Sequence, residues 1–140
     1  MSDLETAIRI AVEAHAGQVD KAGAPYILHP LRVMLSLSGE AEQIAGVLHD
    51  VVEDCDGWSL DRLRSAGFAE AVIDGIEAVT KREGESYPEF CQRAGRNAIG
   101  QAVKIADLRD NLSPARMLAE DADTRRRIEK YRAALAILEG

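Results

Sequence analysis

Residues 47–54 read VLHDVVED and place one imidazole and three carboxylates inside an apolar helical pattern. Burying an unpaired charge is costly, so the pattern requires a compensating partner. Residues four apart stack on one face of an α-helix, which puts His49 one turn before Glu53 and Asp50 one turn before Asp54. A divalent cation screened from water would neutralise these groups. The stretch therefore predicts a metal site on a helix, with an exposed acidic helix face as the alternative.

Two further side chains outside this stretch complete a candidate ligand set. His29 precedes Pro30, which suits the first turn of a helix, and Asp107 interrupts the apolar period of KIADLRDN at 104–111. Each has an ordinary alternative: a histidine bonded to backbone at a helix start, and an aspartate paired with Lys104 or Arg109. The predicted metal ligands are His29, His49, Asp50 and Asp107.

The chemistry of this set indicates both the metal and the reaction. Two imidazoles and two carboxylates suit Mn²⁺, Fe²⁺, Co²⁺ or Zn²⁺ better than Ca²⁺, and Mn²⁺ is our first choice. Four protein ligands leave an octahedral ion open to water and to a substrate oxygen, as hydrolysis of a phosphate ester requires. Glu53 and Asp54, one turn beyond the ligands, are the candidates for proton transfer.

The rest of the chain predicts an all-α fold. Aromatic residues make up only 4% of the 140 residues, which is typical of packed helices rather than of a sandwich or barrel. Residues 18–28, QVDKAGAPYIL, have no helical period and read as a loop. We expect residues 1–140 to form a single domain of about seven to eight helices, with apolar spacings of three and four over 4–16, 29–37, 40–54, 59–66, 69–81, 87–95, 97–112 and 121–138.

Charge and cysteine content limit the partners. A net charge of −7 argues against nucleic acid, which needs a broad positive surface. No apolar run approaches the ~18 residues of a membrane-spanning helix, and the first residues are acidic where a signal peptide would be basic. Cys55 and Cys91 form no CxxC motif, which fits free thiols in a reducing compartment. We expect a cytoplasmic protein that binds a small molecule and neither nucleic acid nor membrane.

Three features near the two ends of the chain keep a structural interpretation. His15, on the apolar face of the first helix, reads as a core histidine or one that supports the ligands. The run RRRIEKYR at 125–132 reads as a solvated helix face. The apolar stripe of the last helix closes the domain or meets a second copy in a homo-oligomer, and it comprises Ile128, Tyr131, Leu135 and Leu138.

These motifs, taken in order, resemble the HD-domain metal phosphohydrolases, and among them the alarmone (ppGpp) hydrolase domain of RelA/SpoT homologues and the small alarmone hydrolases. The resemblance rests on AHAGQ at 14–18, GAPYILHP at 23–30, VLHDVVED at 47–54, AVTK at 78–81 and KIADLRDNL at 104–112. It implies an HD-domain helical bundle that holds one Mn²⁺ through the four predicted ligands. The implied reaction removes the 3′-diphosphate of guanosine tetra- or pentaphosphate and releases pyrophosphate.

The same resemblance assigns further site residues. Glu53 and Asp54 match the acidic pair that assists hydrolysis, Lys21 matches a lysine that contacts the nucleotide, and Asn111 matches an asparagine beside the sugar. Asn111 also lies four residues after Asp107, so helix geometry by itself places it on the same side.

One departure from the family pattern leaves the substrate open. Asp20 stands where alarmone hydrolases carry an arginine that helps to hold the base, and an acid there favours a different nucleotide or phosphoester as the alternative substrate. An alternative of another class is a non-catalytic nucleotide-sensing module, against which the presence of Glu53 and Asp54 argues, because a binding module needs no groups that activate water.

Overall fold

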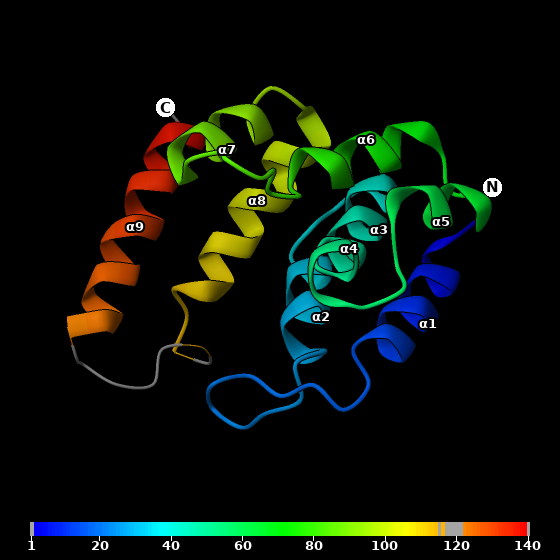
Figure 1. Cartoon of the computed structure of the whole chain (residues 1–140), viewed down its shortest axis with the longest axis horizontal. Coiled ribbons are helices and arrows are strands. Elements are labelled where there is room, and N and C mark those ends of the chain that lie inside the picture. Colours follow the sequence, from blue (N-terminus) through cyan, green and yellow to red (C-terminus); the bar gives the residue numbers. More distant parts are fainter. Residues whose placement is uncertain (1, 115, 117–121, 140) are drawn as a thin grey trace.

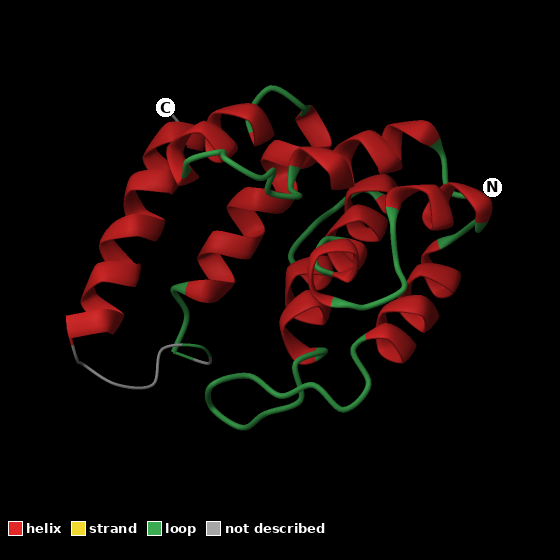
Figure 2. Cartoon of the chain, in the orientation of Figure 1, coloured by secondary structure: helices red, strands yellow, loops and turns green. Residues whose placement is uncertain are grey.

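The computed structural model describes residues 2–114, 116 and 122–139 of the chain. Within these residues every regular element is a helix, apart from an isolated bridge between Val19 and Pro25, and the predicted all-α class is confirmed (Figures 1 and 2). The helices are α1 (Leu4–Ala14), α2 (Leu28–Leu35), α3 (Glu40–Leu48), α4 (Val51–Asp54), α5 (Leu60–Ser65), α6 (Glu70–Ala78), α7 (Tyr87–Ala94), α8 (Ala98–Asn111) and α9 (Ala122–Glu139).

Each of the eight predicted helices has a counterpart, but the helix predicted over 40–54 is divided into α3 and α4. The division falls at His49 and Asp50, the centre of the motif. In a regular helix the carbonyl of Gly46 would accept a hydrogen bond from the N–H of Asp50, four residues on. Here that carbonyl accepts from the Nδ1 of His49 at 2.5 Å. A side chain that captures a ladder carbonyl bends a helix, and this explains the break.

Helix α3 lies at the centre of the bundle and fixes the position of the motif. It packs against α1, α2, α6 and α8, and residues 44–48 of α3 are all buried (Figure 1). Because α3 is surrounded, its C-terminal end carries His49 into the interior. The two helices that bring the other predicted ligands, α2 and α8, pack against α3 and against each other.

Helix α9 lies along α7 and α8 at the edge of the bundle remote from α1 (Figure 1). From its apolar stripe, Leu138 is buried in the core, and Tyr131 and Leu135 pack against the core while partly buried. The stripe thus contributes to this domain's own interior. The predicted start of this helix at residue 121 lies outside the described residues.

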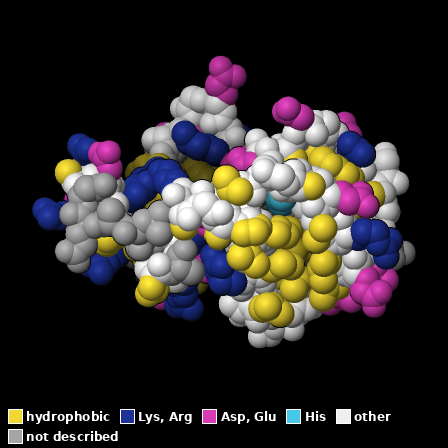
Figure 3. Space-filling view, turned by 90° about the horizontal axis from the view of Figure 1, so that it is seen from below, with side chains coloured by type: hydrophobic (Ala, Val, Ile, Leu, Met, Phe, Trp, Pro, Cys, Tyr) yellow, Lys and Arg dark blue, Asp and Glu magenta, His cyan; other side chains and the backbone are white. Residues whose placement is uncertain are grey.

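The segment between α1 and α2 is a loop, as the sequence predicts, and it is held by its own backbone. Gly17 and Gly23 adopt φ values of +83° and +81°, which glycine alone adopts readily. The N–H of Tyr26 donates to the carbonyl of Gln18 at 2.9 Å. This loop and the end of α8 lie on the same side of the molecule, where hydrophobic side chains gather with Lys and Arg beside them (Figure 3).

Cys55 and Cys91 are both buried and form no disulfide. Among the described residues, no helix combines the length and apolarity needed to cross a membrane.

Candidate metal centre

The four predicted metal ligands come from three parts of the chain and meet at one point. His29 comes from the first turn of α2, His49 and Asp50 from the break between α3 and α4, and Asp107 from α8. One donor atom of each lies within 4.8 Å of a donor atom of every other. The Asp107 Oδ1 is 2.9 Å from His29 Nε2 and 3.2 Å from His49 Nε2. The Asp50 Oδ2 is 3.1 Å from His49 Nε2.

Both imidazoles turn the same nitrogen toward this point, and hydrogen bonds on the far side hold them there. His29 Nδ1 lies 2.6 Å from the Oδ2 of Asp110, and His49 Nδ1 donates to the carbonyl of Gly46. A ring that carries its proton on Nδ1 presents the lone pair of Nε2 as a ligand. The surrounding structure therefore selects the tautomer that a metal requires.

Asp107 divides its two oxygens between the cluster and a buried lysine. Its Oδ1 faces the two imidazoles, while its Oδ2 accepts from the Nζ of Lys104 at 3.0 Å. Burial raises the pKa of Asp107, but the Lys104 ammonium and the two imidazoles outweigh it and hold that pKa well below its usual range. The pairing with Lys104 and the turn toward the cluster, alternatives in the sequence, are both present in the structure.

The donor set fits a divalent transition metal. Two imidazole nitrogens and two carboxylate oxygens converge, and three of the four residues are buried. A divalent cation would take up both negative charges, which answers the electrostatic difficulty posed by residues 47–54. The geometry thus meets the condition that sequence reasoning set for a metal site.

Asp110 is a site residue that sequence reasoning missed. Besides His29, it binds Arg32, whose Nε donates to Oδ1 at 2.7 Å and whose Nη2 donates to Oδ2 at 3.1 Å. The signal was available, because Asp110 follows Asp107 by three residues and shares its helix face. Asp110 orients the His29 ring and would make its Nε2 a stronger donor to a metal bound at the cluster.

Replacing Asp110 by asparagine should weaken metal binding by about 10- to 100-fold, the usual effect of losing such a partner. The amide keeps an oxygen for the His29 N–H but loses the charge that makes the imidazole a stronger donor. Titration of Mn²⁺ into the metal-free protein, followed by calorimetry, measures the change. Asp61→Asn, which removes an exposed carboxylate paired with Arg64, is the matched control. Equal Mn²⁺ affinity in wild type and Asp110→Asn would contradict this role.

The acidic pair predicted for proton transfer lies at the rim of the cluster. Glu53 accepts a hydrogen bond from the N–H of Lys81, which fixes it against the loop after α6. Partial burial raises the pKa of Glu53, opposed by that hydrogen bond. Burial and the neighbouring Asp50 carboxylate raise the pKa of Asp54. Both groups therefore hold a proton more readily than an ordinary exposed carboxylate does.

Tyr26, which was not predicted, links Asp54 of the acidic pair to the predicted ligand Asp50. Its hydroxyl donates to the Oδ2 of Asp50 at 2.6 Å and lies 3.5 Å from the Oδ2 of Asp54. Burial, and then the Asp50 charge, raise the pKa of the Tyr26 phenol, so it stays a donor. Tyr26 is the tyrosine of GAPYILHP at 23–30, and nothing in the spacing of that loop indicates a contact with Asp50.

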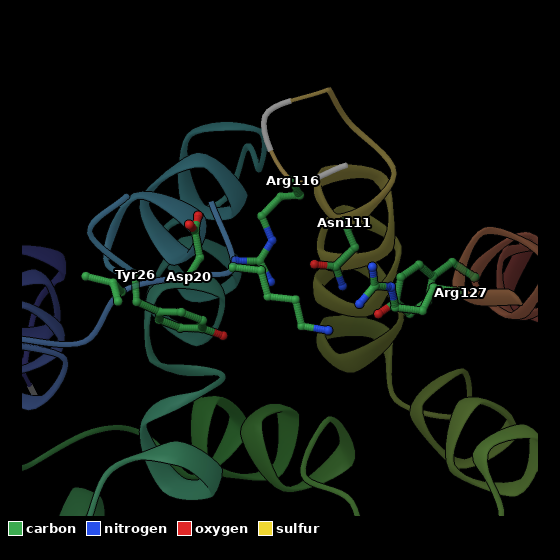
Figure 4. Close-up of a pocket in the computed structure, with 8 residues that line it drawn as sticks. Asp20, Tyr26, Asn111, Arg116 and Arg127 are labelled. Carbon is green, nitrogen blue, oxygen red and sulfur yellow. The ribbon is translucent and has the colours of Figure 1, made fainter. Parts of the chain in front are cut away.

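A cavity of about 250 Å³ opens next to the cluster, between the 18–26 loop and helices α8 and α9 (Figure 4). Lys21 and Asn111, the two residues predicted to bind substrate, both line it. Sequence reasoning missed its other principal lining residues, which are Arg116, Arg127 and Tyr131. Arg127 corrects one interpretation, since the run at 125–132 is not wholly a solvated face.

His15 supports the loop rather than the cluster. It is buried, and its Nδ1 lies 2.8 Å from the Oε1 of Gln18, whose Nε2 donates to the carbonyl of Asp54 at 3.2 Å. Its burial agrees with the prediction of a core histidine, one of the two alternatives from the sequence. Its contact with Gln18 also connects the end of α1 to the start of the loop.

The fold and the cluster together define a helical bundle with a buried His and Asp centre suited to a divalent metal. The sequence model of the HD domain matches residues 7–136 of this chain. Since the match spans nearly the whole sequence, the chain belongs to the HD domain family.

Comparison with known proteins points to one branch of that family. The chain is 31% identical over 139 residues to a probable GTP pyrophosphokinase of Mycobacterium leprae, covering 90% of this chain and 17% of the relative. It is 29% identical over 131 residues to guanosine-3′,5′-bis(diphosphate) 3′-pyrophosphohydrolase of Aquifex aeolicus, covering 85% of this chain and 18% of the relative. The chain thus spans under a fifth of these curated relatives.

A solved structure shares the whole fold. It is described as a metazoan ortholog of SpoT that hydrolyses ppGpp, and it superposes with a TM-score of 0.76 at 22% identity. The superposition covers 98% of this chain and 85% of that one. The likeness establishes the HD-type helical arrangement of the present chain.

Proposed function

We propose that this chain is a metal-dependent phosphohydrolase that removes the 3′-diphosphate of guanosine tetra- or pentaphosphate. One water is consumed, and pyrophosphate and GDP or GTP are released. The observation that carries the proposal is the convergence of two imidazoles and two carboxylates at a point that adjoins a cavity lined by cationic side chains. The naming of the Aquifex relative as a 3′-pyrophosphohydrolase supports the choice of substrate.

Mn²⁺ is the metal we propose, because the mixed nitrogen and oxygen set suits it and four ligands leave positions open for water and substrate. It would be held by His29, His49, Asp50 and Asp107. When bound, it supplies Lewis-acid polarisation of a phosphoryl oxygen and lowers the pKa of water. His29 and His49 are held ready for it by the bonds from their Nδ1 atoms.

Glu53 and Asp54 are the proposed proton-transfer groups. One oxygen of Glu53 is occupied by the N–H of Lys81, which leaves the other to take a proton from the attacking water. The Tyr26 hydroxyl donates to Asp50 and lies 3.5 Å from the Oδ2 of Asp54. Asp54 can give a proton to the leaving oxygen. The raised pKa of both carboxyls makes them better proton acceptors than ordinary exposed carboxylates, as this role requires.

Lys21 and Asn111 are the proposed substrate contacts. Lys21 is exposed on the 18–26 loop, so its ammonium is free to meet phosphate oxygens in the cavity. Asn111 lies one helical turn beyond Asp107 and lines the cavity, which supports this role. A nucleotide whose 3′ end lies at the four ligands would therefore meet Asn111 at the sugar.

The test is an assay of the purified protein with Mn²⁺ and guanosine tetraphosphate. We expect pyrophosphate and GDP in equal amounts, abolition of turnover by a chelator, and recovery when Mn²⁺ is restored. Absence of pyrophosphate across Mn²⁺, Fe²⁺, Co²⁺ and Zn²⁺ would overturn the proposed substrate.

A second substrate class is favoured by one observation, the acid at position 20 where alarmone hydrolases carry arginine. A screen of nucleotides and phosphoesters for released phosphate or pyrophosphate identifies this alternative. Binding of nucleotides with no turnover of any would instead indicate a sensing module. In each case we propose that residues 1–140 act as one domain on a small molecule in the cytoplasm, where the unpaired thiols of Cys55 and Cys91 persist.

A further inference from the structure

The cavity next to the metal centre gathers positive charge in a chain that is negative overall. Lys21, Arg116 and Arg127 line it together with a single acid, Asp20, whereas the whole chain carries a net charge of −7. Three cations around one cavity repel one another unless an anion lies between them. The charge distribution therefore indicates an anionic ligand in this cavity.

Asp20 offsets only one of these three positive charges, and one oxygen of its carboxylate is used to build the loop. Its Oδ1 accepts from the N–H of Ala22 at 2.8 Å and from the N–H of Ala24 at 3.0 Å. Asp residues commonly organise turns in this way. Figure 4 shows the carboxylate turned away from Asn111. One oxygen of this carboxylate is thus committed to the backbone of its own loop.

Arg116 reaches the cavity from the opposite wall, in the segment after α8. It extends into the space between the loop that carries Asp20 and Tyr26 and the helix that carries Asn111 (Figure 4). Its guanidinium carbon lies 5.5 Å from the centre of the Tyr26 ring, within the range of a cation–π contact. Both residues of this contact line the cavity.

Two polar atoms on this side of the cavity are buried and lack partners. The Nη1 of Arg116, a donor, and the Oδ1 of Asn111, an acceptor, form no hydrogen bond with any residue that the structure describes. A buried charged donor without an acceptor costs more than a neutral one, so a ligand oxygen that pairs with it is favoured. The acceptor suits a sugar hydroxyl, and the charged donor suits a phosphate oxygen.

We propose that Arg116 binds the 5′-diphosphate of the nucleotide, an inference that rests on the proposed function to place the 3′ end at the metal centre. With the 3′-diphosphate at the four ligands and the sugar at Asn111, the 5′ side of the nucleotide extends into the cavity. A guanidinium there pairs with phosphate through charge and two N–H donors at once. Arg116 in this way adds a guanidinium to the cavity for the diphosphate, which is a different role from that of the base-holding arginine that the loop lacks at position 20.

The test compares GDP with guanosine, which differ only in the 5′-diphosphate. Calorimetry on the Mn²⁺-loaded protein should show that Arg116→Gln weakens GDP binding by about 10- to 100-fold, as expected for a lost charged hydrogen bond, and leaves guanosine binding within twofold. The GDP affinity of Arg116→Lys should lie between those of wild type and Arg116→Gln. Arg9→Gln, the same charge change on the exposed face of α1, should alter neither. The melting temperature of each variant checks that it is folded.

The outcomes separate this inference from the proposed function. Equal losses for GDP and guanosine would mean that Arg116 contacts the base, and no loss for either, or no GDP binding by wild type, would mean that it binds no ligand; each overturns the inference. If wild type releases pyrophosphate while Arg116→Gln binds GDP normally, the function stands and the inference fails. If GDP binding depends on Arg116 but no pyrophosphate is ever released, the diphosphate site stands and the hydrolase proposal fails.

Discussion

Replacing Asp50 by asparagine is expected to remove the bound metal and the hydrolysis together. The Asp50 Oδ2 lies 3.1 Å from His49 Nε2 and 3.7 Å from His29 Nε2, at the point where the donors converge. The amide has the same shape but no charge, so one of the two carboxylates that would neutralise a divalent cation is lost. Because a metal held by these residues would supply several kcal/mol of transition-state stabilisation, turnover should fall on the order of 10³-fold or more.

Elemental analysis of the purified variant and an assay of pyrophosphate release test this pair of effects. Asp74→Asn, which removes an exposed carboxylate on α6, should keep full metal content and full activity. Circular dichroism should show the helical content of wild type in both variants, since Asp50 adds no helix packing of its own. One equivalent of metal and undiminished turnover in Asp50→Asn would remove Asp50 from the ligand set.

The sequence predicts best the part of the site whose residues are four apart in one helical segment. His49, Glu53, Asp50 and Asp54 are placed relative to one another by the periodicity of a single segment. His29 and Asp107 are distant in sequence, and what marked them was a polar residue in an apolar or helix-start context. The structure brings all four proposed ligands together because α2 and α8 both pack on α3.

What the sequence could not predict depends on side chains that capture backbone and on the path of the chain. Nothing in the spacing of residues 40–54 indicates that the His49 ring would take the carbonyl of Gly46 and divide the helix. Arg116 and Arg127 are two of 17 Lys and Arg residues, and only the return of the chain after α8 brings them to the cavity. The sequence DKAGA at 20–24 is typical of a turn organised by its first residue, Asp20. Asp20 was weighed only against the family arginine, and this structural role was not predicted.

Replacing Glu53 by glutamine should separate catalysis from metal binding, in contrast to Asp50→Asn. Glu53 is not among the four converging donors, so the metal content should match that of wild type. The glutamine side-chain oxygen can still accept from the N–H of Lys81, which keeps the side chain in place, but the amide cannot take up a proton at neutral pH. The turnover number should fall by about 10²- to 10⁴-fold, the usual contribution of a general acid or base.

Steady-state kinetics and elemental analysis on the same preparation decide between three roles for Glu53. A slower turnover number with unchanged KM and full metal content is the result for a group that acts in proton transfer, because such a group is engaged only in the transition state. Loss of metal would make Glu53 a fifth ligand, and unchanged turnover would leave it as an anchor for the loop at Lys81. Glu83→Gln, an exposed acid in that loop, controls for the change of charge near the centre. Only the first result is compatible with a water activated by protein carboxylates at the rim of the cluster.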